Sequence, residues 1–234
     1  MLQCGVEAAN ALVNATVNKE LKAWCLLSAE NELLVVRAIA PKYNIDSFTI
    51  FQVLGKSLRK VTSEAQNCTK SNSFHITHQG NVIQTINLPS AIIIMEAKVD
   101  DLIVKRYRQF KTKSHQQLLD ILKEAYKPDK TEIYNRNLIS PVSKKEISTK
   151  HKIIYDFFQA AEKGLDYLFN SPIHVQIFTT DEQSTVVVKL INRIFFLDFE
   201  NGVSSAELIE ATKKFFEQEV ITKDDIPEAM LEKS

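Results

Sequence analysis

The spacing of apolar residues divides the first 70 residues into helix, strand pair and helix. Apolar residues three and four apart in VEAANALVNATVNKELKA predict a helix. AWCLLS and ELLVVRAIA flank a polar turn and predict two strands, which end at Pro41. SFTIFQVLGKSLRKVTSEA again has helical spacing, so we expect a second helix there.

From about Ser73 the pattern changes to strands. FHITHQGNVIQTI contains a turn at its Gln-Gly-Asn, AIIIMEAKV follows, and DLIVKRY comes after two aspartates. Together they predict a small antiparallel meander of three strands. A helix with Leu118, Leu119 and Leu122 on one face follows and ends near Tyr126. The next segment, KPDKTEIYNRNLISPVSKK, is polar, and its length of about 19 residues is typical of a functional or mobile loop.

The last third of the chain begins with an amphipathic helix. Its apolar stripe comprises Ile147, Ile153, Ile154, Phe157, Phe158 and Ala161. SPIHVQIF fits either a short helix or a strand. STVVVKLINRIFFLDFENGVSSAELIEATKKFFEQ predicts two strands and a helix, which Ser204 and Glu207 introduce as a capping box. No internal repeat is evident.

Charge is balanced overall but unevenly distributed. The chain of 234 residues has 29 Lys and Arg and 29 Asp and Glu, which excludes a global basic field for nucleic acid. Residues 98–152 contain 14 cations and 7 anions, whereas residues 181–234 contain 6 cations and 12 anions. The basic zone is either a solvated surface or a face for a phosphate-bearing partner.

The cysteines and the N-terminus predict a cytoplasmic protein. Cys4, Cys25 and Cys68 are far apart and lack metal-site spacing, which favours a reducing compartment. The N-terminus has neither the basic start nor the apolar core of a signal peptide. The longest apolar run, Ala91–Met95, is far below the roughly 18 residues that a spanning helix needs, so we expect any membrane contact to be peripheral.

Catalytic and metal-binding patterns are missing from the sequence. His75 and His78 would point to opposite faces of a strand, and we expect both on the surface of a hairpin. The other histidines are isolated, and there is no GxSxG, HExxH or glycine-rich phosphate loop. These observations predict a protein without catalytic residues, metal or cofactor.

The order of elements resembles the phox-homology (PX) domain of sorting nexins over residues 73–181. KRYRQF, Lys105–Phe110, matches the family signature Arg-[Arg/Lys]-Tyr-x-x-Phe, and NRNLI and KHKIIYDFFQ match more loosely. The resemblance implies an α+β fold in which a three-stranded antiparallel meander packs on a helical subdomain. Residues 1–72 and 182–234 would be flanking α/β segments, and the latter is similar to the opening hairpin and helix of a ubiquitin-like unit.

The resemblance also implies a phosphoinositide site. Arg106 would bind the 3-phosphate, because a guanidinium can meet a phosphate with two parallel hydrogen bonds. Tyr107 would face the inositol ring, or be an ordinary half-buried strand tyrosine. Arg136 would bind the 1-phosphate and Lys150 the far side of the ring, a role that either of the next two residues can take instead. The proline-rich stretch of the family is missing before the loop.

By this resemblance the protein is a non-catalytic, peripheral module on endosomal membranes. It would bind a 3-phosphorylated phosphoinositide, with phosphatidylinositol 3-phosphate expected, and recruit a protein partner through its N- or C-terminal segment. The alternative is a PX-like protein-interaction scaffold with little or no lipid binding. A nucleic-acid partner is not expected, because clustered aromatic residues for base stacking do not accompany the basic zone.

Overall fold

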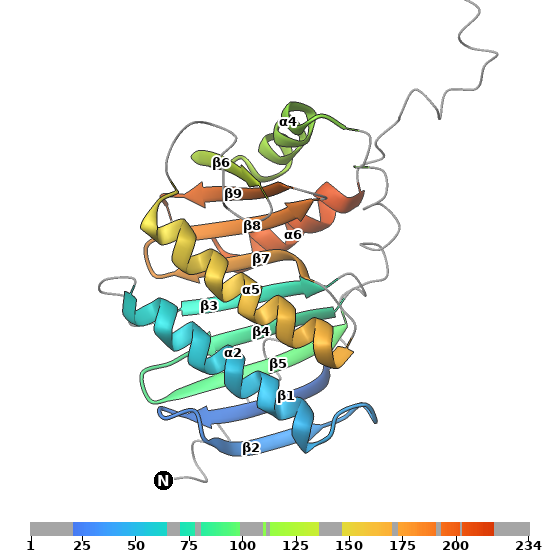
Figure 1. Ribbon diagram of the computed structural model, residues 1–234, viewed down its shortest axis with the longest axis vertical. Helices are drawn as coiled ribbons and strands as arrows, with labels where there is room; N and C mark the ends of the chain where they lie inside the picture. The colour runs from blue at the N-terminus through green and yellow to red at the C-terminus, as the bar shows by residue number, and fades with distance from the viewer. Residues whose placement is uncertain are drawn as a thin grey trace, which may run out of the picture.

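The computed structural model describes residues 21–64, 71–77, 81–98, 110, 113–135, 147–169, 173–190, 193–201 and 203–217. The strands are β1 (Leu21–Ser28), β2 (Leu33–Ala38), β3 (Ser71–Thr77), β4 (Asn81–Asn87), β5 (Ala91–Lys98), β6 (Lys130–Asn135), β7 (Ile173–Thr180), β8 (Ser184–Leu190) and β9 (Arg193–Phe199). They form one nine-stranded sheet in the order β2-β1-β5-β4-β3-β7-β8-β9-β6 (Figure 1). Every neighbouring pair is antiparallel.

The predicted PX-like fold class is therefore wrong. A three-stranded meander on a helical subdomain is replaced by a nine-stranded sheet to which residues 1–72, 73–181 and 182–234 all contribute strands. The local patterns gave most of the strands, but the pairing of β3 with β7 joins segments about a hundred residues apart. Such long-range pairing leaves no mark on the local apolar spacing.

Two further differences have a local cause. Lys130–Asn135, expected within a long loop, is strand β6, which lies at the end of the sheet and, in the part of the chain that the structure describes, pairs only with β9. Most of its side chains are polar, so the segment lacks the alternation of apolar and polar residues that predicts a strand. Ile173–Thr180, which fitted either a helix or a strand, is β7. Helices on the two faces of the sheet, α5 and α6, contact β7, so almost the whole strand is buried although it carries the polar residues His174 and Gln176.

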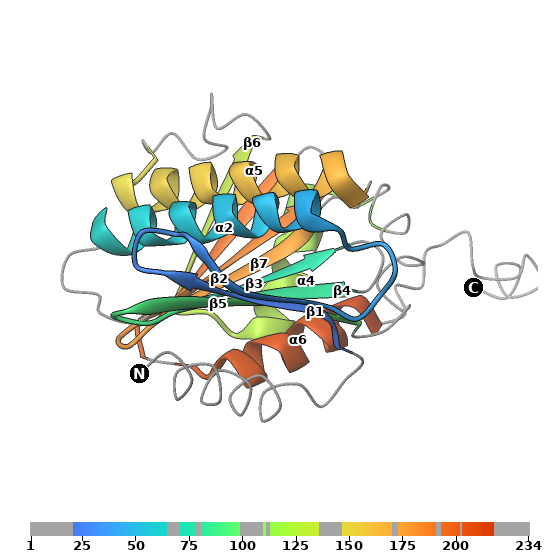
Figure 2. The ribbon, with the colours of Figure 1, turned by 90° about the horizontal axis from the view of Figure 1, so that it is seen from below.

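Four helices complete the described structure: α2 (Ile45–Glu64), α4 (His115–Tyr126), α5 (Thr149–Phe169) and α6 (Ser205–Glu217). All four were predicted from their spacing. Figures 1 and 2 show α2 and α5 side by side on one face of the sheet, with α4 and α6 on the other. None of the described helices is both long enough and apolar enough to span a bilayer.

Helix starts and ends follow their local sequence. Ser114 caps α4: its Oγ accepts a hydrogen bond from the backbone N of Gln117, whose side chain accepts one from the backbone N of Ser114. Lys127 ends the helix in the left-handed conformation with φ 51°. At α6 the predicted cap is present, since the Oγ of Ser204 accepts from the backbone N of Glu207 at 3.3 Å.

The chain contains an internal structural repeat that the sequence analysis missed. Unit 1 consists of β1, β2, α2 and the meander β3-β4-β5, and unit 2 consists of β6, α5 and the meander β7-β8-β9. The units join through the antiparallel β3–β7 pair, in which Phe74 faces Ile177. In the first meander His75 faces Ile83, and Ile83 faces Glu96 on the next strand. In the second meander Phe178 faces Thr185, and Thr185 faces Asp198, so the two rows of facing residues correspond.

The repeat places α2 and α5 antiparallel. Near the start of α2, Ile50 approaches Gly164 near the end of α5, because a Cβ on Gly164 would lie 3.4 Å from Ile50 Cγ2. At the other end, Val61 of α2 and Ile153 of α5 line the same cavity. The two units therefore share one helical layer as well as one sheet.

His75 lies at the junction of the units and is fully buried, so its expected position on a hairpin surface is wrong. Its Nε2 lies 3.1 Å from Ser73 Oγ, and its ring meets the edge of Phe157 with centroids 5.2 Å apart. Burial lowers the pKa of His75 to about 3. Gln176 faces His75 across the β3–β7 pair, and its amide is also buried and without a hydrogen-bond partner among the described residues.

Candidate functional site

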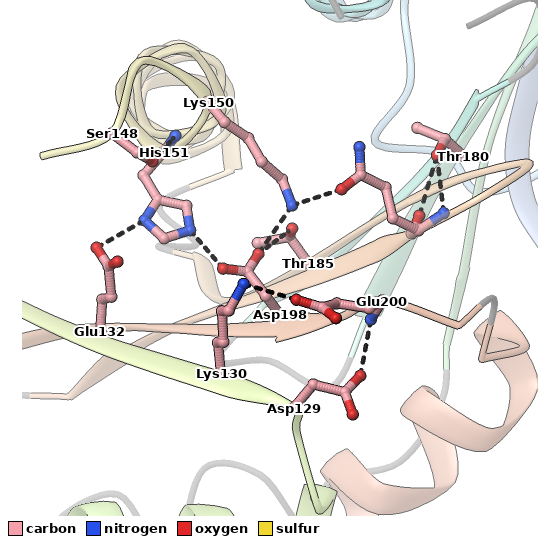
Figure 3. Close-up of polar contacts among 11 residues, drawn as sticks. Asp129, Lys130, Glu132, Ser148, Lys150, His151, Thr180, Thr185, Asp198 and Glu200 are labelled. Carbon is pink, nitrogen blue, oxygen red and sulfur yellow. Dashed lines mark hydrogen bonds and ion pairs between the residues drawn. The ribbon is translucent and has the colours of Figure 1, made fainter.

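The most connected polar site of the described structure lies where α5 begins above strands β6, β8 and β9 (Figure 3). We call it the Asp198 network, and it comprises Glu132, Lys150, His151, Gln183, Thr185 and Asp198. Ser148 sets its geometry by capping α5: the Ser148 Oγ accepts a hydrogen bond from the backbone N of His151 at 3.1 Å. The first turn of the helix thereby directs Lys150 and His151 towards the sheet.

His151 bridges two carboxylates on neighbouring strands. Its Nδ1 lies 3.1 Å from Glu132 Oε2, and its Nε2 lies 2.7 Å from Asp198 Oδ2. The imidazole is only 3% exposed and stacks on Phe196 with ring centroids 4.3 Å apart. An imidazolium donates from both nitrogens, so it is the form that satisfies both carboxylates. His151 is therefore not the isolated residue that the sequence suggested.

Asp198 receives hydrogen bonds on both of its oxygens. Besides His151, the Lys150 Nζ lies 3.0 Å and the Thr185 Oγ1 lies 2.7 Å from Asp198 Oδ1. Burial acts to raise the pKa of Asp198, but the hydrogen bond and charge of His151, with Thr185 and Lys150, outweigh it and hold that pKa well below its ordinary value. The carboxylate is therefore ionised at every physiological pH.

The network holds the start of α5 on the sheet, and its side chains are not arranged around a common point where a metal ion could bind. The two nitrogens of His151 point to different carboxylates, so the three side chains do not converge on one point. Among the described residues no group of His, Cys, Asp and Glu side chains is placed to hold a metal ion. The function of the network in these contacts is to position the helix.

Unit 1 has a counterpart of this network at Glu96. Its side chain is 2% exposed, it accepts a hydrogen bond from the hydroxyl of Tyr43, and its Oε1 lies 3.4 Å from Lys42 Nζ. Lys42 and Tyr43 immediately precede α2, just as Lys150 and His151 open α5. Burial is the largest effect on Glu96 and raises its pKa, against the weaker opposing effect of the lysines.

A cavity of about 240 Å³ adjoins the Asp198 network. The end of α2 contributes Val61 and Glu64, the start of α5 contributes Lys150 and Ile153, and β7 contributes Phe178. The cavity therefore lies between elements of the two units, and it depends on their joining.

Of the four residues predicted to bind phosphoinositide, the structure describes Lys150 alone. Arg106, Tyr107 and Arg136 lie outside the described residues. The Lys150 ammonium is already held by Asp198 Oδ1 at 3.0 Å and by Gln183 Oε1 at 2.9 Å. A phosphate at Lys150 would have to compete with that carboxylate.

The sequence analysis passed over the acids of both networks. Glu96 follows the apolar run IIIM, and Asp198 follows IFFL, so each is a lone charge at the end of a buried strand. A buried carboxylate needs a hydrogen-bonding or charged partner. An acid directly after a run of apolar residues could therefore have identified both residues as candidates for a polar site. Most of their partners come from the segment that precedes α2 and from the start of α5, whose positions on the sheet the local sequence does not give.

No model of a known protein family matches the sequence, and no curated protein is detectably similar to it. The function is therefore argued from the geometry of the described residues.

Proposed function

We propose that this protein is a non-catalytic interaction module that binds an extended segment of a partner protein along strand β2. The supporting observation is the distribution of exposed apolar side chains. Among the described residues the large apolar side chains that are exposed are Leu34 (42%), Val36 (46%), Ile39 (55%) and Val53 (45%). The first three lie on β2 or just after it, Val53 lies on α2, and all four belong to unit 1.

The backbone of β2 is also suited to accept a further strand. Among the described residues β2 is the last strand of the sheet and pairs only with β1, so its outer side offers N–H and C=O groups. Its sequence, LLVVRA, contains no proline and only one charged residue, Arg37. A largely apolar edge with a single charge is typical of sites where a partner adds a strand.

The opposite end of the sheet does not share these properties. The terminal strand β6 begins with Lys130, whose Nζ lies 2.6 Å from Glu200 Oε1, and it carries Glu132 of the Asp198 network. Charged side chains disfavour the addition of a strand. The proposal therefore applies to β2 and not to β6.

The junction of the units supports the same mode of binding. There β3 and β7 pair edge to edge, from Ser71 facing Thr180 to Thr77 facing Ile173. Pairing of strand edges is thus the way in which this protein already joins two of its parts. A partner strand on β2 would extend the sheet in the same manner.

A peptide selection tests the proposal directly. Peptides selected from a random library on the whole protein should alternate apolar and polar residues, because one face of an added strand packs on Val36. Bound peptide should slow hydrogen exchange at the amides of residues 33–38. Val36→Lys should weaken binding at least tenfold, whereas Thr131→Lys on β6 should leave it unchanged. Protection elsewhere, or equal binding by Val36→Lys, would contradict the proposal.

Phosphoinositide binding on endosomal membranes stays a prediction that rests on the KRYRQF motif. Its PX fold is not the fold of this protein, and three of its four site residues lie outside the described part of the chain. Co-sedimentation with liposomes that contain one phosphoinositide each tests it. Headgroup-selective binding that Arg106→Ala abolishes would support lipid recognition, and equal failure of both proteins would leave the interaction module alone.

A further inference from the structure

The cavity between α2 and α5 has a wall and a rim of different chemistry. Its wall is mostly apolar: Val61, Ile154 and Phe178 are at most 4% exposed, and Ile153 is partly buried. Polar side chains also line the cavity, among them the buried Thr185 on the wall and Glu64 and Lys150 at the rim. A group that enters the cavity therefore contacts more apolar than polar surface.

The charges at the rim are already balanced. Lys150 Nζ lies 3.0 Å from Asp198 Oδ1, and Glu64 Oε1 lies 3.9 Å from Lys60 Nζ. An anion near Lys150 would lie close to the ionised Asp198, and a cation near Glu64 would lie close to Lys60. The rim thus offers no excess of either charge, which favours a neutral ligand.

The volume decides the size of the ligand. An apolar cavity of about 150 Å³ holds benzene, and sites for drug-sized ligands begin at about 300 Å³. The present cavity, at about 240 Å³, lies between these sizes. It suits one phenyl or indole group and is too small for a nucleotide or a dinucleotide cofactor.

We propose that this cavity is a binding site for one neutral aromatic group of phenyl to indole size. Val61 comes from unit 1 and Phe178 from unit 2, so an occupant would contact both units at their junction. The group could belong to a free aromatic molecule or to a Phe or Trp side chain of another protein. This site lies apart from β2 and does not depend on the function proposed for that strand.

Titration of the whole protein with indole and toluene tests the site. Both should bind and should shift the NMR signals of the Ile153 and Ile154 methyl groups. Indole-3-acetate and tryptamine should bind at least tenfold more weakly than indole, because their charges find no unpaired partner. A lack of binding by indole and toluene, or methyl shifts elsewhere in the protein, would overturn the proposal.

Two substitutions that fill the cavity provide the matched test. Val61→Phe fills it from unit 1 and Ile153→Trp from unit 2, and each should reduce indole affinity at least tenfold. Glu124→Ala, on the exposed side of α4, should retain it. If either filling variant fails to fold, the other decides, and the methyl shifts of the wild type stand independently. Unchanged affinity in a folded filling variant would overturn the proposal.

The two sources of the aromatic group are distinguished by N-acetyl-tryptophanamide, which presents indole on a peptide backbone. Binding of both indole and this compound would assign the site to an aromatic side chain presented on a peptide backbone. Binding of indole alone would assign it to a free small molecule. Both results support a site for a neutral aromatic group.

Discussion

The two units of this protein place an acid at the same position and surround it differently. Glu96 lies on β5 in the row of facing residues that begins at His75, and Asp198 lies on β9 in the equivalent row that begins at Phe178. Both acids lie under the start of a helix. Glu96 contacts Tyr43 and Lys42, and its pKa is raised. Asp198 contacts a lysine, a histidine and a threonine, and its pKa is lowered.

This difference shows that the fold fixes the position of the acid and the neighbouring side chains fix its charge. Burial alone raises the pKa of a carboxyl group, as it does for Glu96. Several hydrogen-bond donors reverse that effect at Asp198. The junction on α5 is therefore held by an ionised network, whereas at the junction on α2 Glu96 contacts the hydroxyl of Tyr43 and the ammonium of Lys42.

The largest expected effect comes from removing these charges one at a time. Asp198→Asn leaves Lys150 without its counter-ion and should lower the free energy of unfolding by about 3 kcal/mol at pH 7. Glu96→Gln keeps a hydrogen-bonding partner for Tyr43 and should cost about 1 kcal/mol. Urea unfolding measures both. The exposed acid Glu200, changed to Gln, is the control and should change little, and equal losses at the two buried acids would contradict the comparison.

Lowering the pH should destabilise the protein through His75 at the junction of the two units, separately from the effects of Glu96 and Asp198. In the native state burial holds the pKa of His75 at about 3, against 6.5 in the unfolded chain. As the pH falls below 6.5 the unfolded state binds a proton that the native state excludes, so stability falls, by about 2 kcal/mol between pH 7 and pH 5. His75→Phe, which copies the residue at the equivalent position in unit 2, should remove this dependence.

The two acids contribute to the pH dependence with opposite signs. The raised pKa of Glu96 means that the native state binds its proton first, so this group adds stability as the pH falls towards 4.5. Asp198 contributes stability above pH 3.8, which is lost only as the pH falls through its lower native pKa. Urea unfolding from pH 7 to pH 4 in the Glu96→Gln background isolates His75, and a flat profile there would refute the prediction.

A smaller effect should come from two helix glycines, with opposite signs in the two units. A Cβ on Gly55 of α2 would lie 2.6 Å from Leu27 Cδ1 and 3.3 Å from Ile92 Cδ1, so Gly55→Ala forces the core to shift. We expect a net loss of about 1 kcal/mol, because overpacking costs more than the helix propensity of alanine returns.

Gly164 of α5 offers the matched case. Its nearest neighbour would be Ile50 Cγ2 at 3.4 Å, an ordinary contact, so Gly164→Ala should stabilise by about 0.5 kcal/mol through helix propensity. Thermal unfolding of both variants checks the pair. Stabilisation by Gly55→Ala would show that α2 packs less closely on β1 and β5 than the structure has it.

Local patterns predicted those elements whose apolar spacing stands out. The helices at 45–64, 115–126, 149–169 and 205–217 and the strands in AWCLLS, AIIIMEAKV and RIFFLDF follow from their own residues. Strand β6 was missed because a terminal strand needs few apolar side chains. His75 was misplaced on the surface because nothing in FHIT shows that α5 covers this face of the strand, where Phe157 packs on the imidazole.

The candidate site was less accessible from the sequence. Lys150 was singled out through the PX resemblance, and its contact with Asp198 joins residues 48 positions apart. Glu132 and Asp198 lie on different strands and meet only because His151 enters between them from α5. Predicting that cluster requires the sheet order and the position of the helix above it.

The sequence by itself determined where most of the described helices and strands form, because periods of 3.6 and 2 residues and the caps at Ser114 and Ser204 act within a few residues. Only the tertiary structure decided that two units share one sheet and one helical layer. That decision depends on which strand edges pair and which apolar faces cover one another. These are contacts between distant parts of the chain, and they alone made the Asp198 network, the cavity and the open edge at β2.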